Sequence, residues 1–289
     1  MPRRFDVPLP DGRTMTLGSR TLVMGIVNVT PDSFSDGGVL SDPRRAIDAA
    51  VQMIADGADI LDVGGESTRP GAQALGAAEE LDRVLPVIEG LASRVSVPIS
   101  VDTYKASVAA AAVRAGAAIV NDVSGLRYDA ALGRVVANNG AALILMHTRG
   151  RSSDMYRHAT YHDVVDEVLD ELRESVAFAT GAGVPKDRLL IDPGLGFAKE
   201  PPHNYEVLGR LDEFSDFGRP IVIGASRKGF LTRAIGRDVV PAERDWATAA
   251  TVAAAVIAGA HIVRVHAVRE LAQVARVADE IRKYHRAIP

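Results

Sequence analysis

Polar side chains that could do chemistry stand at or just after the ends of short apolar runs along the 289-residue chain. One group consists of two carboxylates, one amide and one cation: Asp102, Asp192, Asn121 and Lys228. A second group favours an anion: Asn28, Arg69, Arg264 and His266. No Ser-His-Asp arrangement is apparent and cysteine is absent, so the residues do not indicate covalent catalysis.

The first group suits a flat heterocycle. A buried carboxylate such as Asp192 can accept two parallel N–H bonds from an amino-pyrimidinone edge. Asn121 can donate and accept at once, and Lys228 can donate to a ring carbonyl or nitrogen. These residue types therefore predict recognition of a ring with a hydrogen-bonding edge.

The second group suits phosphate. Arginine offers a fork of donors to phosphate oxygens and His266 can add another donor. Asn28 together with Asp36 could hold a magnesium ion through oxygen. The alternative for Arg264 and His266 is a salt-bridged floor of the fold, and the residues alone leave both interpretations open.

A loop rich in turn formers, residues 28–38 (NVTPDSFSDGG), follows the first long apolar run. Phe34 is an isolated aromatic residue between Asp32 and Asp36. Its ring either packs the loop onto the body or contacts a flat ligand.

The elements that position these residues read as eight apolar runs, each followed by a helical pattern. Continuous apolar strands alternating with amphipathic helices predict a parallel sheet covered on both faces. Eight such units in one domain predict a (β/α)8 barrel, whose strand tips all face one mouth; an open doubly wound sheet is the rival. The expected strands are 21–27, 60–63, 99–101, 119–120, 141–146, 189–191, 221–223 and 262–265, with helices starting near Pro43, Glu79, Lys105, Asp129, Tyr161, His203, Arg244 and Val268.

The N-terminal residues 1–18 alternate around Pro10-Asp11-Gly12, which predicts a β-hairpin covering one end of the core. We find no linker or low-complexity segment, so residues 1–289 are expected to form one domain. The uncharged stretch that starts at Trp246 is read as a packed helix running into a strand rather than a membrane span.

Composition restricts the partners. A net charge of −4 leaves no basic excess for nucleic acid, and the absence of cysteine suits the cytoplasm. The N-terminus has no apolar segment of signal-peptide length. We therefore expect small-molecule substrates, with no nucleic acid or membrane as partner.

Seven runs, in order from residue 24 to 266, carry a resemblance to a known family: MGIVNVTPDSFSDGG, GGESTRPGA, SVDT, NDVSG, DPGLGF, SRKGF and RVH. They resemble dihydropteroate synthase of bacterial folate synthesis, a sulfonamide target. The resemblance implies a (β/α)8 barrel that joins 7,8-dihydropterin-6-ylmethyl diphosphate to 4-aminobenzoate and releases diphosphate. It also implies that diphosphate leaves first, giving a pterin-stabilised carbocation.

The resemblance assigns roles by motif. It implies a pterin pocket, and a diphosphate and Mg²⁺ site containing Asn28 as metal ligand. It implies two loops that close over 4-aminobenzoate, and, with the Ala-rich helix Ala247–Ala258, a homodimer. The implied pterin residues are Asp102, Asn121, Met146, Asp192 and Lys228; the diphosphate residues are Asn28, Arg264 and His266; the loop and aminobenzoate residues are Phe34, Asp36, Thr68, Arg69, Pro70, Phe197 and Gly229.

Three positions depart from the family pattern. Gly229 stands where the family has Ser or another polar residue, Ala267 where Asp commonly follows the histidine, and Thr148 lies within the MH-x-RG run. Gly229 and Ala267 keep one alternative open beside the synthase, a pterin-binding paralogue with little or no turnover. The runner-up enzyme is a pterin-dependent methyltransferase that shares the barrel, although it would not need the SRK, RVH or NVTPDSF runs.

Overall fold

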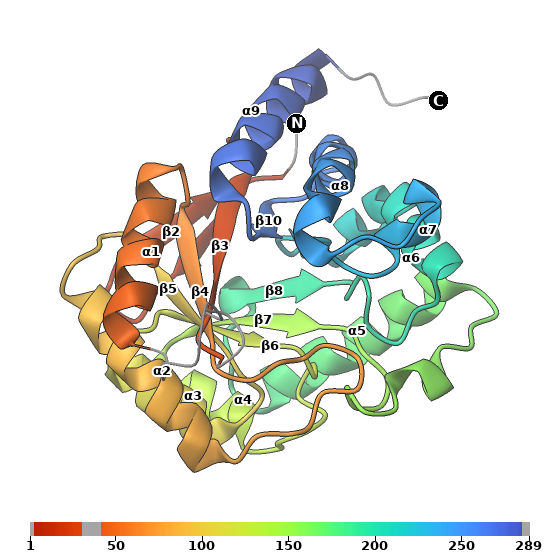
Figure 1. Cartoon of the computed structure of the whole chain (residues 1–289). Coiled ribbons are helices and arrows are strands. Elements are labelled where there is room, and N and C mark those ends of the chain that lie inside the picture. Colours follow the sequence, from red (N-terminus) through yellow and green to blue (C-terminus); the bar gives the residue numbers. More distant parts are fainter. Residues whose placement is uncertain (1–2, 31–41, 285–289) are drawn as a thin grey trace.

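The apolar runs form one sheet of eight parallel strands in the computed structural model, which describes residues 3–30 and 42–284 (Figure 1). The strand order is β8-β7-β6-β5-β4-β3-β10-β9. A parallel bridge between Ile191 at β8 and Ile221 beside β9 joins the two ends. The sheet is therefore closed into a barrel, which confirms the (β/α)8 prediction over the open sheet. The strands are β3 (Leu22–Asn28), β4 (Ile60–Gly64), β5 (Ile99–Asp102), β6 (Ile119–Asp122), β7 (Ala142–Met146), β8 (Leu189–Asp192), β9 (Val222–Ile223) and β10 (Ile262–Val265).

Several strands extend one or two residues beyond their apolar runs. Strand pairing uses backbone N–H and C=O groups, so a polar residue can continue a strand just as an apolar residue can. Asn28 pairs with Gly64, and Asp102 pairs with Asn121. The polar tips are thus held in the sheet itself, which fixes their spacing.

Helices follow the strands and surround the barrel (Figure 1). The predicted starts agree within three residues. The start of α5 is set by a cap, because Asp163 accepts from the backbone N–H groups of Val165 and Asp166 at 2.9 Å. One helix was missed: two helices, not one, lie between β9 and β10. The helices are α1 (Pro43–Ala55), α2 (Ala77–Ala92), α3 (Ala106–Arg114), α4 (Leu132–Asn139), α5 (Val164–Gly181), α6 (Pro201–Gly209), α7 (Leu231–Ile235), α8 (Asp245–Ile257) and α9 (Val268–Tyr284).

The predicted N-terminal hairpin is present as β1 (Phe5–Pro8) and β2 (Thr14–Leu17), paired antiparallel. Its buried side chains Val7 and Leu17 cluster with Met24, Ile60 and Ile262 near the starts of the barrel strands. The hairpin therefore closes the amino end of the barrel, as expected, and leaves the carboxyl end for a site.

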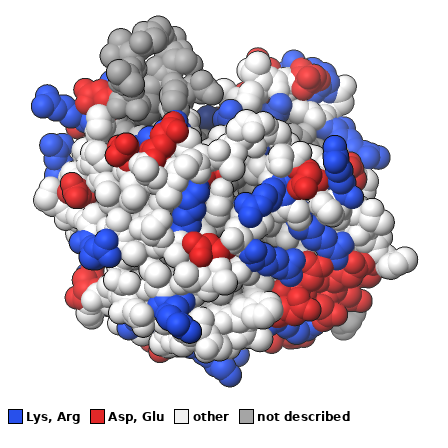
Figure 2. Space-filling view, turned by 90° about the horizontal axis from the view of Figure 1, so that it is seen from below, with Lys and Arg blue, Asp and Glu red and all other residues white. Residues whose placement is uncertain are grey.

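Charged side chains of both signs share the face seen from below in Figure 2, where Lys and Arg are interspersed with Asp and Glu.

Among the helices of the described residues, none is long and apolar enough to cross a membrane. The stretch from Trp246 that raised this question is α8, which packs beside α9 and leads into β10.

Candidate active site

Four strand tips bring the predicted heterocycle-binding residues to the carboxyl end of the barrel. Asp102 and Asn121 are register partners on β5 and β6, and Asp192 is the register partner of Met146 on β7. Asn121, Met146 and Asp192 are buried, while 11% of the Asp102 side chain is exposed. Their polar groups therefore face a restricted space rather than bulk water.

Arg264 joins this group. Its Nε donates to Oδ2 of Asp62 at 2.6 Å and its Nη2 donates to Oδ2 of Asp102 at 2.7 Å. Asn121 donates to the same Asp62 oxygen at 3.2 Å. Arg264 is salt-bridged, as one of the two sequence interpretations expected, but the bridge includes Asp102 of the predicted pocket.

Burial perturbs the titration of the pocket. Desolvation raises the pKa of Asp102 to about 7, against the opposing effect of Arg264. Burial lowers the pKa of Lys228 to about 7, while the charge of Asp192 opposes this shift. Burial also raises the pKa of Asp192, although Lys228 and a backbone N–H oppose it. Strongly perturbed groups gathered in one cleft are typical of functional sites.

The segment between β8 and α6 places Lys228 against Phe197. The Lys228 ammonium donates to the Leu195 carbonyl and lies 4.3 Å from the centre of the Phe197 ring. A Cβ at Gly196 would come within 2.6 Å of Lys228 Cδ, so only glycine allows this approach. On the other side, Arg227 has a φ of 59° and its guanidinium pairs with Asp245 at 2.7 and 2.8 Å. Lys228 is thus held from both directions.

His266 is oriented by Ser226. The Ser226 hydroxyl accepts the backbone N–H of His266 at 3.1 Å and lies 2.8 Å from its Nδ1. A hydroxyl that donates to Nδ1 leaves the ring hydrogen on Nε2, which is then available as a donor. Burial, followed by the charges of Arg264, Arg227 and Arg69, lowers the pKa of His266 to about 3. A neutral histidine among three cations is the electrostatic environment of an anion site.

The remaining predicted residues that the structure describes lie at or after strand ends at the same end of the barrel. Asn28 is the last residue of β3, and Arg69 and Pro70 are exposed in the segment after β4. That segment is tied to the one after β7, because Gly71 N–H donates to Ser152 O at 2.8 Å and Ser152 Oγ donates to the carbonyl of Thr68, which is partly buried, at 3.4 Å. Gly229 is exposed, and a Cβ there would meet no atom within 4 Å. Phe34 and Asp36 lie outside the described residues.

Three residues that position the site were missed from the sequence. Asp62 sits within an apolar strand and is fully buried, and its charge inside that run was the available signal. Ser226 belongs to the SRKGF run, but the run alone does not indicate that its hydroxyl orients His266. Lys199 follows the DPGLGF run and is only 1% exposed, although lysine side chains usually lie at the surface.

Comparison with known proteins agrees with this geometry. The sequence model of a family described as pterin binding enzyme matches residues 24–266. A dihydropteroate synthase of Bacillus subtilis is 46% identical over 260 residues, which cover 90% of this chain and 88% of the relative.

Solved structures of dihydropteroate synthases are also similar to this chain. A Yersinia pestis dihydropteroate synthase in a sulfonamide drug complex has a TM-score of 0.89 and 38% identity, covering 97% of this chain and all of the other. The Xanthomonas albilineans enzyme in complex with 7,8-dihydropteroate has a TM-score of 0.85 and 38% identity, covering 99% of this chain and 100% of the other.

These matches define a pterin-binding barrel enzyme of the transferase class. Within that class, the chain belongs to the dihydropteroate synthase family, which confirms the resemblance, and its function is that of a dihydropteroate synthase.

Proposed function

We propose that the chain condenses 7,8-dihydropterin-6-ylmethyl diphosphate with 4-aminobenzoate, releasing diphosphate, through a dissociative mechanism. The observation that carries the proposal is Arg264, which bonds Asp102 of the heterocycle pocket at 2.7 Å while its charge lowers the pKa of His266. The heterocycle group and the anion group therefore meet at one guanidinium. A substrate that joins a pterin to a diphosphate needs this adjacency.

The pterin is bound by the buried acceptors. The carboxylate of Asp192 accepts from the amino-pyrimidinone edge, Asn121 donates and accepts, and Lys228 donates to a ring acceptor. Asp102 accepts from a further N–H of the ring. A hydrogen bond to an ionised group such as Asp192 contributes about 1.5–3 kcal/mol, and one to the neutral Asn121 amide about 0.5–1.5 kcal/mol.

The diphosphate leaves toward the cations. Arg264, Arg69 and the Nε2–H of His266 stabilise the charge that develops on the leaving oxygen as the C–O bond breaks. The bond electrons go to diphosphate and leave the pterin-stabilised carbocation.

Magnesium fits the donors that are present. Among the described residues, no group of three or more His, Asp or Glu could hold a metal ion. Mg²⁺ in phosphate-transfer sites takes few protein oxygens and relies on substrate phosphates and water, so the amide oxygen of Asn28 is a suitable donor. When bound, the ion would add positive charge beside the diphosphate.

4-Aminobenzoate attacks from the Phe197 side. The aniline nitrogen lone pair forms the new C–N bond, and a proton then leaves that nitrogen. Thr68, Pro70 and Gly229 would line the place of this substrate and help to exclude water from the cation. Phe34 and Asp36, which the resemblance assigns to the same substrate, lie outside the described residues. Sulfonamides would compete for the same place.

The test is a coupled assay for diphosphate release, with and without 4-aminobenzoate. Release that depends on 4-aminobenzoate is the expected result, and Asp192→Asn should weaken pterin binding about tenfold. Absence of such release from folded protein would favour the pterin-binding paralogue. Methyl transfer is not favoured, because the close relatives are synthases.

We also propose a cytoplasmic homodimer. Its support is the pair of neighbouring helices α8 and α9, which carry exposed apolar side chains including Trp246, Val277 and Ile281. The cysteine-free composition is compatible with a reducing compartment.

A further inference from the structure

The segment between β8 and α6 is wound around one buried ammonium group. Gly194, Gly196 and Ala198 have φ angles of 73°, 80° and 46°, an unusual density of left-handed residues. At the centre lies Lys199, whose Nζ is 3.2 Å from both the Gly194 and the Phe197 carbonyl oxygens. The third partner is Nδ1 of His147 at 2.8 Å. An ammonium has three N–H donors, and all three have an acceptor here.

The same segment carries groups of the proposed active site. Oδ1 of Asp192 accepts the backbone N–H of Gly194 at 2.7 Å, so the Gly194 peptide sets the orientation of that carboxylate. The Leu195 carbonyl accepts from Lys228, and the Phe197 ring lies under the same ammonium. Lys199 therefore bonds the Gly194 and Phe197 carbonyls, which lie on either side of the Leu195 carbonyl that contacts Lys228.

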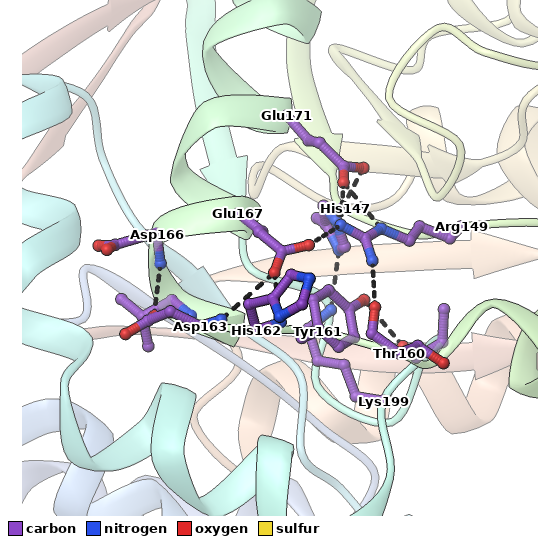
Figure 3. Close-up of polar contacts among 12 residues, drawn as sticks. His147, Arg149, Thr160, Tyr161, His162, Asp163, Asp166, Glu167, Glu171 and Lys199 are labelled. Carbon is purple, nitrogen blue, oxygen red and sulfur yellow. Dashed lines mark hydrogen bonds and ion pairs between the residues drawn. The ribbon is translucent and has the colours of Figure 1, made fainter.

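A partly buried network of Glu171 and Arg149 orients the His147 ring, as Figure 3 shows. His147 Nε2 lies 3.2 Å from Oε2 of Glu171, whose other oxygen accepts from Nε of Arg149 at 2.7 Å. An ionised carboxylate holds the ring hydrogen on Nε2, which leaves Nδ1 as an acceptor toward Lys199. Burial, together with the charge of Lys199, lowers the pKa of His147 to about 3, so the ring stays neutral.

We propose that Lys199 is a positioning residue of the synthase reaction: its ammonium gathers the Gly194 and Phe197 carbonyls and His147, and thereby orients Asp192 toward the pterin and Phe197 toward 4-aminobenzoate. This inference rests on the proposed function, since it takes Asp192 as a pterin ligand.

The test compares variants by calorimetry with 6-hydroxymethylpterin. Lys199→Met removes the donors and shortens the unbranched side chain by one atom, so pterin affinity should fall about tenfold, the effect of one charged hydrogen bond. Asp279→Asn is the control, because Asp279 is also buried but bonds Thr21 at the amino end of the barrel. The control should lose stability and keep its pterin affinity.

A pH series separates positioning from simple packing. Burial lowers the pKa of Lys199 to about 7; Lys228 and Arg149 also lower it, while Asp192 and Glu171 raise it. The ammonium is present below this pKa and lost above it. The ratio of wild-type to Lys199→Met affinity should therefore be largest near about pH 6 and shrink severalfold by about pH 8.5.

The outcomes are distinct. Unchanged affinity in folded Lys199→Met, or a ratio that does not vary with pH, overturns the positioning role. If Lys199→Met does not fold, Lys199→Gln, which retains two N–H donors one bond closer to the backbone, should show a smaller loss with the same pH trend. Asp192→Asn is measured in parallel: if it binds pterin normally, the proposed pterin pocket itself is wrong, whereas a loss there with none in Lys199→Met refutes only this inference.

Discussion

Asp62 is the single carboxylate on which Arg264 and Asn121 both depend. Replacing it with asparagine leaves the buried guanidinium without its Nε charge partner, and breaking one side of a buried ion pair typically costs about 3–5 kcal/mol. Because Asn retains one acceptor oxygen, we expect Asp62→Asn to lower the free energy of unfolding by about 3 kcal/mol, together with the rate of diphosphate release. Denaturant titration measures the first and the coupled assay the second.

The control for Asp62→Asn is Asp48→Asn. Asp48 also pairs with an arginine, Arg94, but at 3.6 Å and with both side chains more than half exposed. Exposed pairs contribute about 0–1 kcal/mol, so the control should be nearly neutral. Equal losses in the two variants would show that Asp62 has no special role.

Gly229 is a departure from the family pattern that directly follows Lys228. A Cβ there meets nothing within 4 Å, so Gly229→Ser can be accommodated without moving a neighbour. A hydroxyl near the 4-aminobenzoate carboxylate would add a bond worth about 1.5–3 kcal/mol before water is displaced. We expect a severalfold lower KM for 4-aminobenzoate with pterin affinity unchanged. Steady-state kinetics measure this effect. The control is Gly209→Ser, at an equally open position at the end of α6. The same KM for 4-aminobenzoate in both variants would contradict the prediction.

The sequence placed Asp102, Asn121 and Asp192 at strand ends, as the structure has them, but it did not show which side chains they contact. Asp102, Asn121 and Asp192 end apolar strands, which is a visible pattern in the sequence. The bond from Arg264 to Asp62 joins β10 to β4 across 202 positions, and no local pattern encodes such a contact. The role of Ser226 was hidden for the same reason, since it lies 40 positions from His266.

At the scale of elements, Gly196 decides how closely the β8–α6 segment approaches Lys228. Its φ is 80°, and an added Cβ would lie 2.6 Å from Lys228 Cδ. A left-handed conformation costs a residue with a Cβ about 1–2 kcal/mol. Gly196→Ala should therefore lose at least about this much stability and should also weaken pterin binding, because Lys228 must move.

The matched control is Gly181→Ala at the end of α5, where a Cβ would meet no atom within 4 Å. Alanine in a helix is favoured over glycine by up to about 1 kcal/mol, so this variant should be neutral or slightly stabilising. Thermal unfolding and pterin calorimetry on both variants make the comparison. Normal pterin affinity in Gly196→Ala would separate the segment from the placement of Lys228.

Element order was predictable because each strand reads as an apolar run and each helix has its own period. Element ends were less so. The start of α5 at Val164 is set by the Asp163 cap, and α7 has only five residues, too short for its periodicity to be recognised. The closure between β8 and β9 depends on a single bridge, which leaves no mark on composition.

At the scale of the molecule, four of the eight exposed large apolar side chains among the described residues lie on two adjoining helices, α8 and α9. Trp246, Ala250 and Ala254 are four residues apart and exposed, so they form one stripe along α8. Val277, Ile281 and Tyr284 form a similar exposed stripe on α9, which packs beside α8. Small residues in the first stripe permit close approach of another surface, and the two stripes together offer an apolar face of the kind that marks protein–protein contact.

The proposed homodimer predicts a specific effect of charge on that face. Ala254→Arg places a long cation in the middle of the α8 stripe, where two copies of the chain would meet like charge to like charge. Because Ala254 is exposed within the chain, the fold itself should tolerate the change. Sedimentation velocity should show wild type at twice the chain mass of 30.6 kDa and Ala254→Arg shifted toward the single chain. Ala49→Arg, at an exposed alanine of α1, should sediment as wild type does. A wild-type protein at the single-chain mass, or an Ala254→Arg protein that remains double, would mean that this face is not the dimer contact.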